Sequence, residues 1–364
     1  MSKKSTNYEL LRILLTIFIP TYHWLLYNGI FYADNSINNL ISIIPFTGIS
    51  FSCLYAFITM SSFFLLKKKS NWSMKKVLDF VALLLTLLLF KNIVINGLYP
   101  GKMMNYYVDT FFLKGAWWYV YPYVLLMIFY PLLNHFIYHC KKTTLYICTA
   151  LLGLWFLINE YMNLTIMLND CVMFLFLYFL MACLMQHEPS SFYKKHKKII
   201  LFSIYTICVV AITVISLLLK LPNNGLSLEF ENEIFQWAHG RYNILGVISG
   251  IALFTIFKDI EVPYIPIIHK ASKITLFVFL LHETVMCVFW YFEIKSCEFL
   301  AYLPSSEFFG LFFIYIVFCI FGAFLIYQAY YTLFAPLWER AIHWLCEVPI
   351  IKKLETTYIK LMEK

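Results

Sequence analysis

Charged residues are scarce in this sequence of 364 residues. They make up 13% of the chain, whereas hydrophobic residues make up 62% and aromatic residues 20%. Because soluble globular domains carry about 25% charged residues, this composition excludes a soluble domain. The chain is predicted to be an all-α, polytopic integral membrane protein with most of its length in the bilayer.

Signatures of metal and redox chemistry are also missing. The ten cysteines are scattered without a CxxC or Cys/His ligand spacing, so neither a disulfide framework nor a zinc site is expected. His135 and His139 have the spacing of a metal pair on one helix face, but no acid or cysteine joins them, and we interpret them as an interfacial pair. The sequence also lacks a Gly-rich phosphate loop, a Ser-His-Asp order and a paired-carboxylate motif. We therefore expect no bound metal and no permanently bound cofactor.

Ten apolar stretches approach the length of about 20 residues that spans a bilayer core. We expect ten transmembrane helices with the approximate limits 9–31, 40–66, 77–97, 116–138, 145–159, 169–186, 199–219, 241–257, 272–292 and 308–334. The first stretch is too long for a cleaved signal peptide, and no small-residue cleavage site follows it. We assign residues 1–334 to a transmembrane domain and residues 335–364 to a cytoplasmic amphipathic tail.

The distribution of lysine and arginine predicts the orientation of the chain. With a cytoplasmic N-terminus, 21 of the 28 basic residues fall in cytoplasmic segments, five fall in outer segments and two lie within spans. Both termini are therefore expected in the cytoplasm, which agrees with an even number of spans. The same asymmetry explains much of the net charge of +8, so no nucleic-acid partner is expected.

The first span contains two residues that hydropathy alone would not place there, Arg12 and His23. Ionisable side chains inside a span are costly and normally face a bundle interior or a wet cavity. Eleven residues at about 100° each make about three turns, so the two side chains share one helix face, about 16 Å apart along the axis. Pro20 can kink the helix just before His23, as suits a cavity wall. In the alternative interpretation, Arg12 reaches the lipid headgroups and His23 is a structural histidine bonded to another helix.

The end of the second span combines serines with basic residues. Ser61 and Ser62 allow close approach of helices. Three lysines follow them, Lys67, Lys68 and Lys69. These lysines form either an ordinary stop-transfer cluster or a phosphate-binding patch beneath a cavity.

The ninth span carries His282 and Glu283 near its middle. An intramembrane histidine and acid are a functional candidate by default, with a buried structural hydrogen bond as the alternative. Adjacent residues of a helix point about 100° apart. Glu283 is therefore not expected to orient His282, and it would instead face another helix.

Aromatic residues gather on the predicted outer side. The fourth span opens with Trp117, Trp118 and Tyr119, where an aromatic belt is ordinary. The longest outer loop, residues 220–240, mixes acids, amides and aromatics that include Trp237, and Arg241 follows it. Such a surface suits sugars, although its composition fits a plain solvated loop equally well.

Four of these stretches, taken in order, resemble segments of the membrane acyltransferase-3 family. The family's first span carries an arginine and a histidine separated by ten residues, which Arg12 and His23 match within NYELLRILLTIFIPTYHW. The family's late Tyr-Leu-Ile-His segment is similar to FVFLLHETV, which contains His282. The resemblance covers essentially the whole chain.

The other two segments match with departures. The family's second span ends in a Phe-rich Ser-Gly segment followed by basic residues, which is similar to FITMSSFFLLKKK. Here Ser62 replaces the glycine, and lysines stand where arginines are common, so the bidentate fork of arginine is missing. The family's Trp-Tyr/Phe-Leu segment followed by Leu-Pro-Leu-Leu is similar to WWYVYPYVLLMIFYPLL.

The resemblance implies an O-acyltransferase, most often an O-acetyltransferase. It also implies a multi-pass protein of the cell membrane, here expected to be a bacterial plasma membrane. Such an enzyme takes the acyl group from cytoplasmic acyl-CoA, here expected to be acetyl-CoA. It transfers this group to a hydroxyl of a cell-surface or lipid-linked polysaccharide. The expected partners are therefore acyl-CoA, a carbohydrate acceptor and the lipid bilayer.

The resemblance also suggests roles for the candidate residues. An imidazole at His23 suits a general base because its pKa lies near working pH, and His282 would orient the acceptor or the developing oxyanion. The expected catalytic residues are His23, Arg12 and His282. The expected donor-binding residues are Arg12, Ser61, Ser62, Lys67, Lys68 and Lys69. The expected acceptor-binding residues are Trp117, Trp118, Tyr119, Trp237, Arg241 and Glu283.

Two other classes of protein are alternatives. A transporter or flippase of a lipid-linked sugar would also have many spans and buried charges, but it need not bind CoA. A sensor or scaffold would not need both Arg12 and His23.

Overall fold

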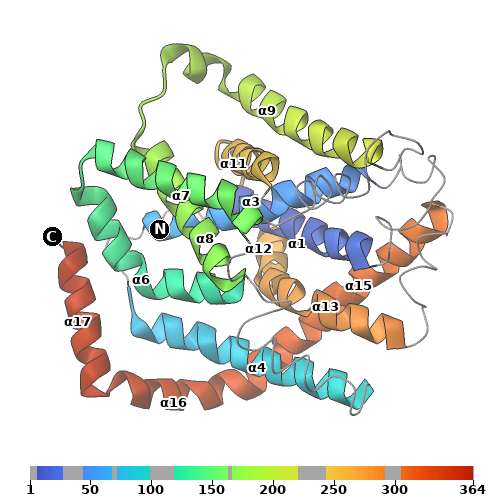
Figure 1. Ribbon diagram of the computed structural model, residues 1–364. Coiled ribbons are helices and arrows are strands. Elements are labelled where there is room, and N and C mark those ends of the chain that lie inside the picture. The colour runs from blue at the N-terminus through green and yellow to red at the C-terminus, as the bar shows by residue number, and fades with distance from the viewer. Residues whose placement is uncertain are drawn as a thin grey trace. The chain divides into compact units, whose positions relative to one another are not determined.

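The computed structural model describes residues 6–27, 44–67, 72–98, 119–162, 166–219, 243–291 and 305–363. Every regular element in these ranges is helical and no strand occurs among them (Figure 1). The expected all-α fold is therefore confirmed. The chain forms two compact units, the first made of Met1–Phe57 and Pro189–Phe324 and the second of Ile58–Glu188 and Leu325–Lys364.

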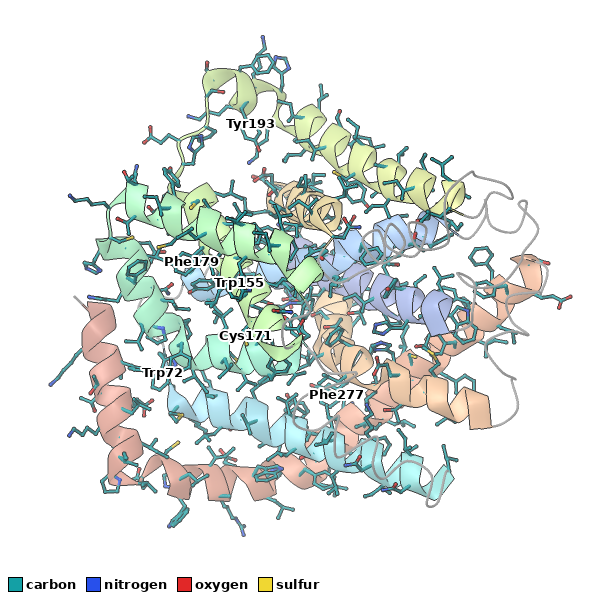
Figure 2. All side chains as sticks on the ribbon, viewed as in Figure 1. Trp72, Trp155, Cys171, Phe179, Tyr193 and Phe277 are labelled. Carbon is teal, nitrogen blue, oxygen red and sulfur yellow. The ribbon has the colours of Figure 1, made fainter. Side chains whose placement is uncertain are left out.

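Six helices in the described part are long and apolar enough to cross a membrane. Their bounds are Pro45–Leu66, Met74–Leu98, Val120–His139, Asn169–Gln186, Ser191–Leu218 and Ser306–Cys346. Shorter apolar helices cover Lys142–Ile158 and Ile244–Lys258. Exposed apolar side chains on the helices, such as Trp155 (Figure 2), suit contact with lipid. Each of the ten predicted spans overlaps a helix, and the number of ten crossings stays a prediction.

The first unit surrounds the first helix of the chain. Its helices are α1 (Thr6–Tyr27), the start of α3 (Pro45–Leu66), α9 (Ser191–Leu218), α11 (Ile244–Lys258), α12 (Pro266–Ala271), the 3₁₀ turn η1 (Ser272–Ile274), α13 (Thr275–Tyr291) and most of α15 (Ser305–Ala329). α1 packs against α11, α12 and α13, and α9 packs along α11 (Figure 1). The first helix thus meets elements more than 200 residues later in the sequence.

Close packing of α3 on α11 depends on two glycines of α11. A Cβ atom at Gly250 would lie 2.5 Å from Cβ of Tyr55, and one at Gly246 would lie 2.5 Å from the ring of the same tyrosine. Any larger residue would therefore push the two helices apart. The hydroxyl of Ser52 donates to Oγ of Ser249 at 2.7 Å in this interface, and small residues of this kind let membrane helices approach closely.

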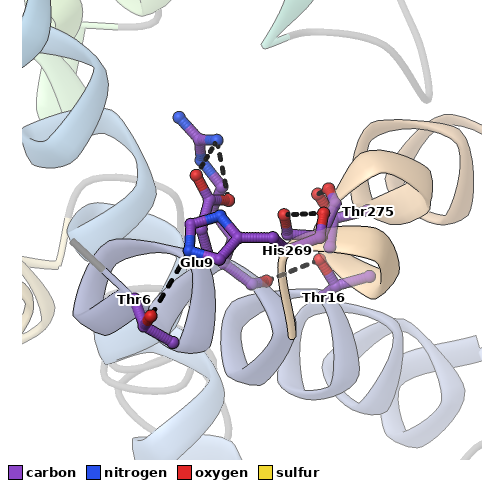
Figure 3. Close-up of polar contacts among 7 residues, drawn as sticks. Thr6, Glu9, Thr16, His269 and Thr275 are labelled. Carbon is purple, nitrogen blue, oxygen red and sulfur yellow. Dashed lines mark hydrogen bonds and ion pairs between the residues drawn. The ribbon is translucent and has the colours of Figure 1, made fainter. Parts of the chain in front are cut away.

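Two buried polar residues fix the start of α1. Nδ2 of Asn7 donates to the carbonyl oxygen of Phe257, near the end of α11, at 2.7 Å. Oγ1 of Thr6 accepts a hydrogen bond from the N–H of Ile265 at 3.2 Å and lies 3.3 Å from Nε2 of His269 (Figure 3). Leaving a buried polar group without its hydrogen-bond partner costs stability. These bonds therefore hold α1 in one position along α11 and α12.

The second unit consists of helices from the middle of the chain and the C-terminal segment. Its helices are the end of α3, α4 (Met74–Leu98), α6 (Val120–His139), α7 (Lys142–Met162), α8 (Ile166–Gln186), the π-helical segment η2 (Tyr330–Phe334), α16 (Ala335–Cys346) and α17 (Pro349–Glu363). α7 packs along α8, and α6 contacts both α4 and α8. This unit holds the aromatic and serine residues at the end of the second predicted span.

The C-terminal segment forms two helices where the sequence predicted one amphipathic tail helix. Pro349 begins α17, where proline is favoured because its missing N–H has no helical partner to lose. α16 packs on α4, with Nε1 of Trp338 donating to Oγ1 of Thr86 at 2.9 Å. α17 packs on α6, and the ring of Tyr358 meets that of Trp72 edge-on at 4.7 Å. The boundary at residue 334 and the cytoplasmic location of the tail stay predictions.

Candidate active site

Two histidines from opposite ends of the sequence meet inside the first unit. His23 lies on α1 and His282 on α13, and their nearly coplanar rings face each other edge to edge, with centroids 4.8 Å apart and planes 19° apart. Nδ1 of His23 is 2.6 Å from Nε2 of His282. The His23 side chain is 15% exposed, whereas His282 is 2% exposed. The structure thus brings together two of the three predicted catalytic residues.

The hydrogen bonds of His282 determine which nitrogen carries each proton. Nδ1 of His282 lies 2.5 Å from the carbonyl oxygen of Phe279, and a carbonyl oxygen can only accept. Nδ1 of His282 is therefore the donor, and in the neutral ring Nε2 is the acceptor. His23 must then donate through Nδ1–H, which leaves the basic lone pair of a neutral His23 on Nε2.

A carboxylate completes the cluster. Oε1 of Glu283 lies 3.5 Å from Nδ1 of His23, and its side chain is 12% exposed. As the sequence predicted, Glu283 faces a residue of another helix rather than its neighbour His282. A carboxylate at this distance stabilises a positive charge on the His23 ring, and a low-dielectric environment strengthens that effect.

Aromatic packing holds the histidine pair in position. The hydroxyl of Tyr315 on α15 donates to the carbonyl oxygen of His282 at 3.1 Å. Its buried ring stacks on Trp24, next to His23 in the sequence, with centroids 4.8 Å apart and planes 23° apart. Tyr315 therefore ties α15 to both helices that carry the histidines.

The cluster also has the composition of a metal site. One ligand atom from each of His23, His282 and Glu283 lies within 4.8 Å of the others. Two nitrogens bound to a tetrahedral zinc ion would be about 3.3 Å apart, given bonds of about 2.0–2.1 Å. The two ring nitrogens are instead 2.6 Å apart, which is a hydrogen-bond distance. A metal would need the rings to separate, and the expected absence of a metal requirement stays a prediction.

Arg12 lies at a second polar site of the first unit. Its Nη1 contacts both carboxylate oxygens of Glu9, at 3.0 and 3.2 Å (Figure 3). The pair lines a pocket with a volume of about 370 Å³, together with Lys270 and Lys273. At about 1.5 Å of rise per residue, Arg12 and His23 are about 16 Å apart along α1. The cationic pocket and the histidine cluster thus lie at two different positions along α1.

These features agree with a comparison to known families. The family described as an acyltransferase domain matches residues 6–328. The chain belongs to the acyltransferase-3 family. No curated protein and no solved structure matches it significantly. With six candidate spans in its described part, this acyltransferase is a multi-pass membrane protein.

Other predicted residues of the acyltransferase lie in its second unit. Oγ of Ser61 is 3.0 Å from the hydroxyl of Tyr119, and both Tyr119 and Ser62 are buried. Nζ of Lys67 lies 4.3 Å from the ring centroid of Phe63, a cation–π contact. The roles of these residues stay predictions. Outside the described residues lie Lys68, Lys69, Trp117, Trp118, Trp237 and Arg241.

The structure brings to these sites several residues of the acyltransferase for which the sequence alone predicted no role. Lys270 and Lys273 were counted only as basic residues that orient the chain. Their position at the start of the ninth predicted span was nevertheless a usable signal of a site residue. Glu9 had a signal too, because an acid three residues before an arginine faces it on a helix. Tyr315 had none, since a tyrosine in an apolar stretch is ordinary.

Proposed function

We propose that this protein is an O-acyltransferase, specifically an O-acetyltransferase, that uses acyl-CoA as donor and a hydroxyl of a surface or lipid-linked polysaccharide as acceptor. The observation that carries the proposal is the histidine pair with its carboxylate, buried among helices of a membrane acyltransferase. An imidazole with a defined proton position is the group that activation of a weakly acidic sugar hydroxyl requires.

In the proposed reaction, Nε2 of His23 removes the proton of the acceptor hydroxyl. The hydroxyl oxygen forms a bond to the thioester carbonyl carbon, and the carbon–sulfur bond then breaks. The proton passes from His23 to the departing CoA sulfur, so that ester and CoA thiol are the products. His23 keeps its Nδ1 proton throughout and donates it in a hydrogen bond to Nε2 of His282, and Glu283 stabilises the transient imidazolium, as an acid does beside a catalytic histidine.

The position of Arg12 supports acyl-CoA as the donor. Phosphates bind cations through charge-assisted hydrogen bonds, and Arg12 lies about 16 Å from His23 along the axis of α1. That separation is comparable to an extended pantetheine arm. The phosphates of the donor would sit at Arg12 while its thioester reaches His23.

The proposed topology has ten spans, with both termini in the cytoplasm and the protein in a bacterial plasma membrane. The bias of 21 to five basic residues supports it. Arg12, Lys270 and Lys273 share one pocket, and all three belong to segments at or near the predicted cytoplasmic side. A donor from the cytoplasm would therefore enter at this pocket.

The function is tested by mass spectrometry of surface glycans from cells with and without the gene. We expect acyl esters to disappear in the deletion strain and to return with the wild-type gene. His23→Gln should not restore them. The matched control His196→Gln alters a histidine on α9 of the same unit, outside the cluster, and should restore them. A loss of glycan from the surface, with an unchanged number of esters on each glycan that remains, would instead favour a transporter.

A further inference from the structure

The pocket around Arg12 carries more positive than negative charge. Three permanent cations line it, Arg12, Lys270 and Lys273, against the single carboxylate of Glu9. Within the described part of the chain, neither lysine forms an ion pair with a carboxylate. A concave site with uncompensated cations raises the local concentration of anions. The charge and the volume of about 370 Å³ thus suit an anionic group rather than an apolar one.

The ion pair between Arg12 and Glu9 shows which anion fits. Both carboxylate oxygens of Glu9 lie within hydrogen-bond distance of Nη1 of Arg12, and phosphate oxygens likewise accept charge-assisted hydrogen bonds from a guanidinium. The Arg12 side chain is 37% exposed and that of Glu9 18%. A partly exposed ion pair of this kind contributes little to stability, so an incoming phosphate can replace the carboxylate.

The wall that carries the lysines is fixed to α1. Lys270 and Lys273 are three residues apart across α12 and η1, a spacing that brings side chains to the same face of a helix. Between them, Oγ of Ser272 donates to the carbonyl oxygen of His269 at 3.1 Å. His269 in turn contacts Thr6 of α1 (Figure 3). Its ring also stacks on Tyr264 with centroids 4.6 Å apart. The lysines are therefore held opposite Arg12 by a connected set of contacts.

We propose that this pocket binds the phosphate monoester and diphosphate of the acyl donor through Lys270 and Lys273, and that Glu9 competes with the phosphate for Arg12. The proposal rests on acyl-CoA as the donor. It assigns the main phosphate contacts to Lys270 and Lys273, at the start of the ninth predicted span. The sequence had assigned them to residues that include Lys67, which belongs to the second unit. Glu9 then sets the affinity, because each bound phosphate must displace it.

The probe is adenosine 3′,5′-bisphosphate, which is the phosphorylated end of CoA without the arm. Its binding to the full-length protein in phosphatidylcholine nanodiscs is measured by titration calorimetry. We expect Lys270→Gln and Lys273→Gln each to weaken binding about fivefold, and the double variant at least tenfold. Lys195→Gln, an exposed lysine on α9, is the matched control and should bind like the wild type.

The variant Glu9→Gln gives the opposite and more specific result. Removing the competing charge should strengthen binding up to about fivefold, while a purely structural role of Glu9 would weaken it. Affinity in all variants should fall with ionic strength, since the contacts are partly exposed. Unchanged binding in the double lysine variant, or weaker binding in Glu9→Gln, would overturn the proposal.

Phosphate monoesters also occur on lipid headgroups, so a second arm uses nanodiscs that contain phosphatidic acid. Binding of the bisphosphate that persists in these discs supports the nucleotide site, and its loss overturns that assignment in favour of a headgroup. Transfer of acetyl from acetyl-CoA is measured on the same preparations. If the protein transfers acetyl but its binding does not depend on the two lysines, the assignment of this pocket is wrong and the proposed function stands. If the wild type shows neither CoA binding nor transfer, the proposed function is wrong too.

Discussion

Replacement of His282 tests whether this residue fixes the proton position of His23. In the structure the His282 ring connects the carbonyl oxygen of Phe279 to Nδ1 of His23, with distances of 2.5 and 2.6 Å. His282→Ala removes the acceptor of the Nδ1–H hydrogen bond, while the carboxylate of Glu283 stays 3.5 Å from Nδ1. The Nδ1 proton can then move to Nε2, where it blocks the lone pair that takes the acceptor proton.

The size of the effect follows from the lost hydrogen bond. His23 becomes cationic as it takes up the proton, and a hydrogen bond to a charged group contributes about 1.5–3 kcal/mol. Each 1.36 kcal/mol of activation free energy corresponds to about a tenfold change in rate. We therefore expect kcat to fall about 10- to 150-fold in His282→Ala. KM for acetyl-CoA should change little, because the ring lies about three helical turns from Arg12.

The assay measures CoA thiol release from acetyl-CoA by protein in proteoliposomes, in the presence of the glycan acceptor. His282→Gln provides the rescue, since its Oε1 can accept a hydrogen bond from Nδ1 of His23 as the imidazole does. We expect His282→Gln to exceed His282→Ala by about tenfold in kcat. Because His282 is buried, the melting temperature of each variant is measured in parallel to exclude a folding defect.

Two results would refute the reasoning. If folded His282→Ala keeps kcat within about twofold of the wild type, His282 does not position His23. If His282→Gln and His282→Ala are folded and equally impaired, the lost function of His282 is not the acceptance of a hydrogen bond. In either case the account of the proton position on His23 is wrong.

Three further predictions concern the acid, the helix packing and the topology. Glu283→Gln should lower kcat roughly tenfold at unchanged KM for acetyl-CoA, since it keeps the shape but removes the charge beside the imidazolium; an unchanged kcat contradicts this role. Gly250→Ala should lower the free energy of unfolding by about 1–3 kcal/mol, because its Cβ would lie 2.5 Å from that of Tyr55. The control Gly310→Ala, with open space around the new Cβ, should leave the melting temperature nearly unchanged. Reporters fused to the two termini should both be inaccessible from outside the cell, and labelling of either would contradict the topology.

The sequence alone located the residues of the histidine cluster but not their contact. Arg12 and His23 could be assigned to one face because helix geometry is local and regular. His282 and Glu283 were found because polar residues are expensive in a span. The 2.6 Å contact between His23 and His282 joins residues 259 positions apart, and no local rule fixes such a distance.

The pocket proposed for the donor was harder to predict from the sequence. Lys67, Lys68 and Lys69 attracted attention because three consecutive lysines are conspicuous. Lys270 and Lys273 are fewer and separated, and they gain significance only because α12 and η1 pack beside Arg12. A charge cluster that forms in space therefore escapes a search for charge clusters in the sequence.

The most direct test of the central claim is the transfer of isotope-labelled acetyl from acetyl-CoA to the glycan acceptor by the purified protein in proteoliposomes. The wild type should form a labelled ester and release one CoA thiol for each ester formed. His23→Gln should bind adenosine 3′,5′-bisphosphate as the wild type does, yet its rate should fall about 10²–10⁴-fold, as expected for loss of a general base. A folded His23→Gln protein that forms the labelled ester at the wild-type rate would contradict the account.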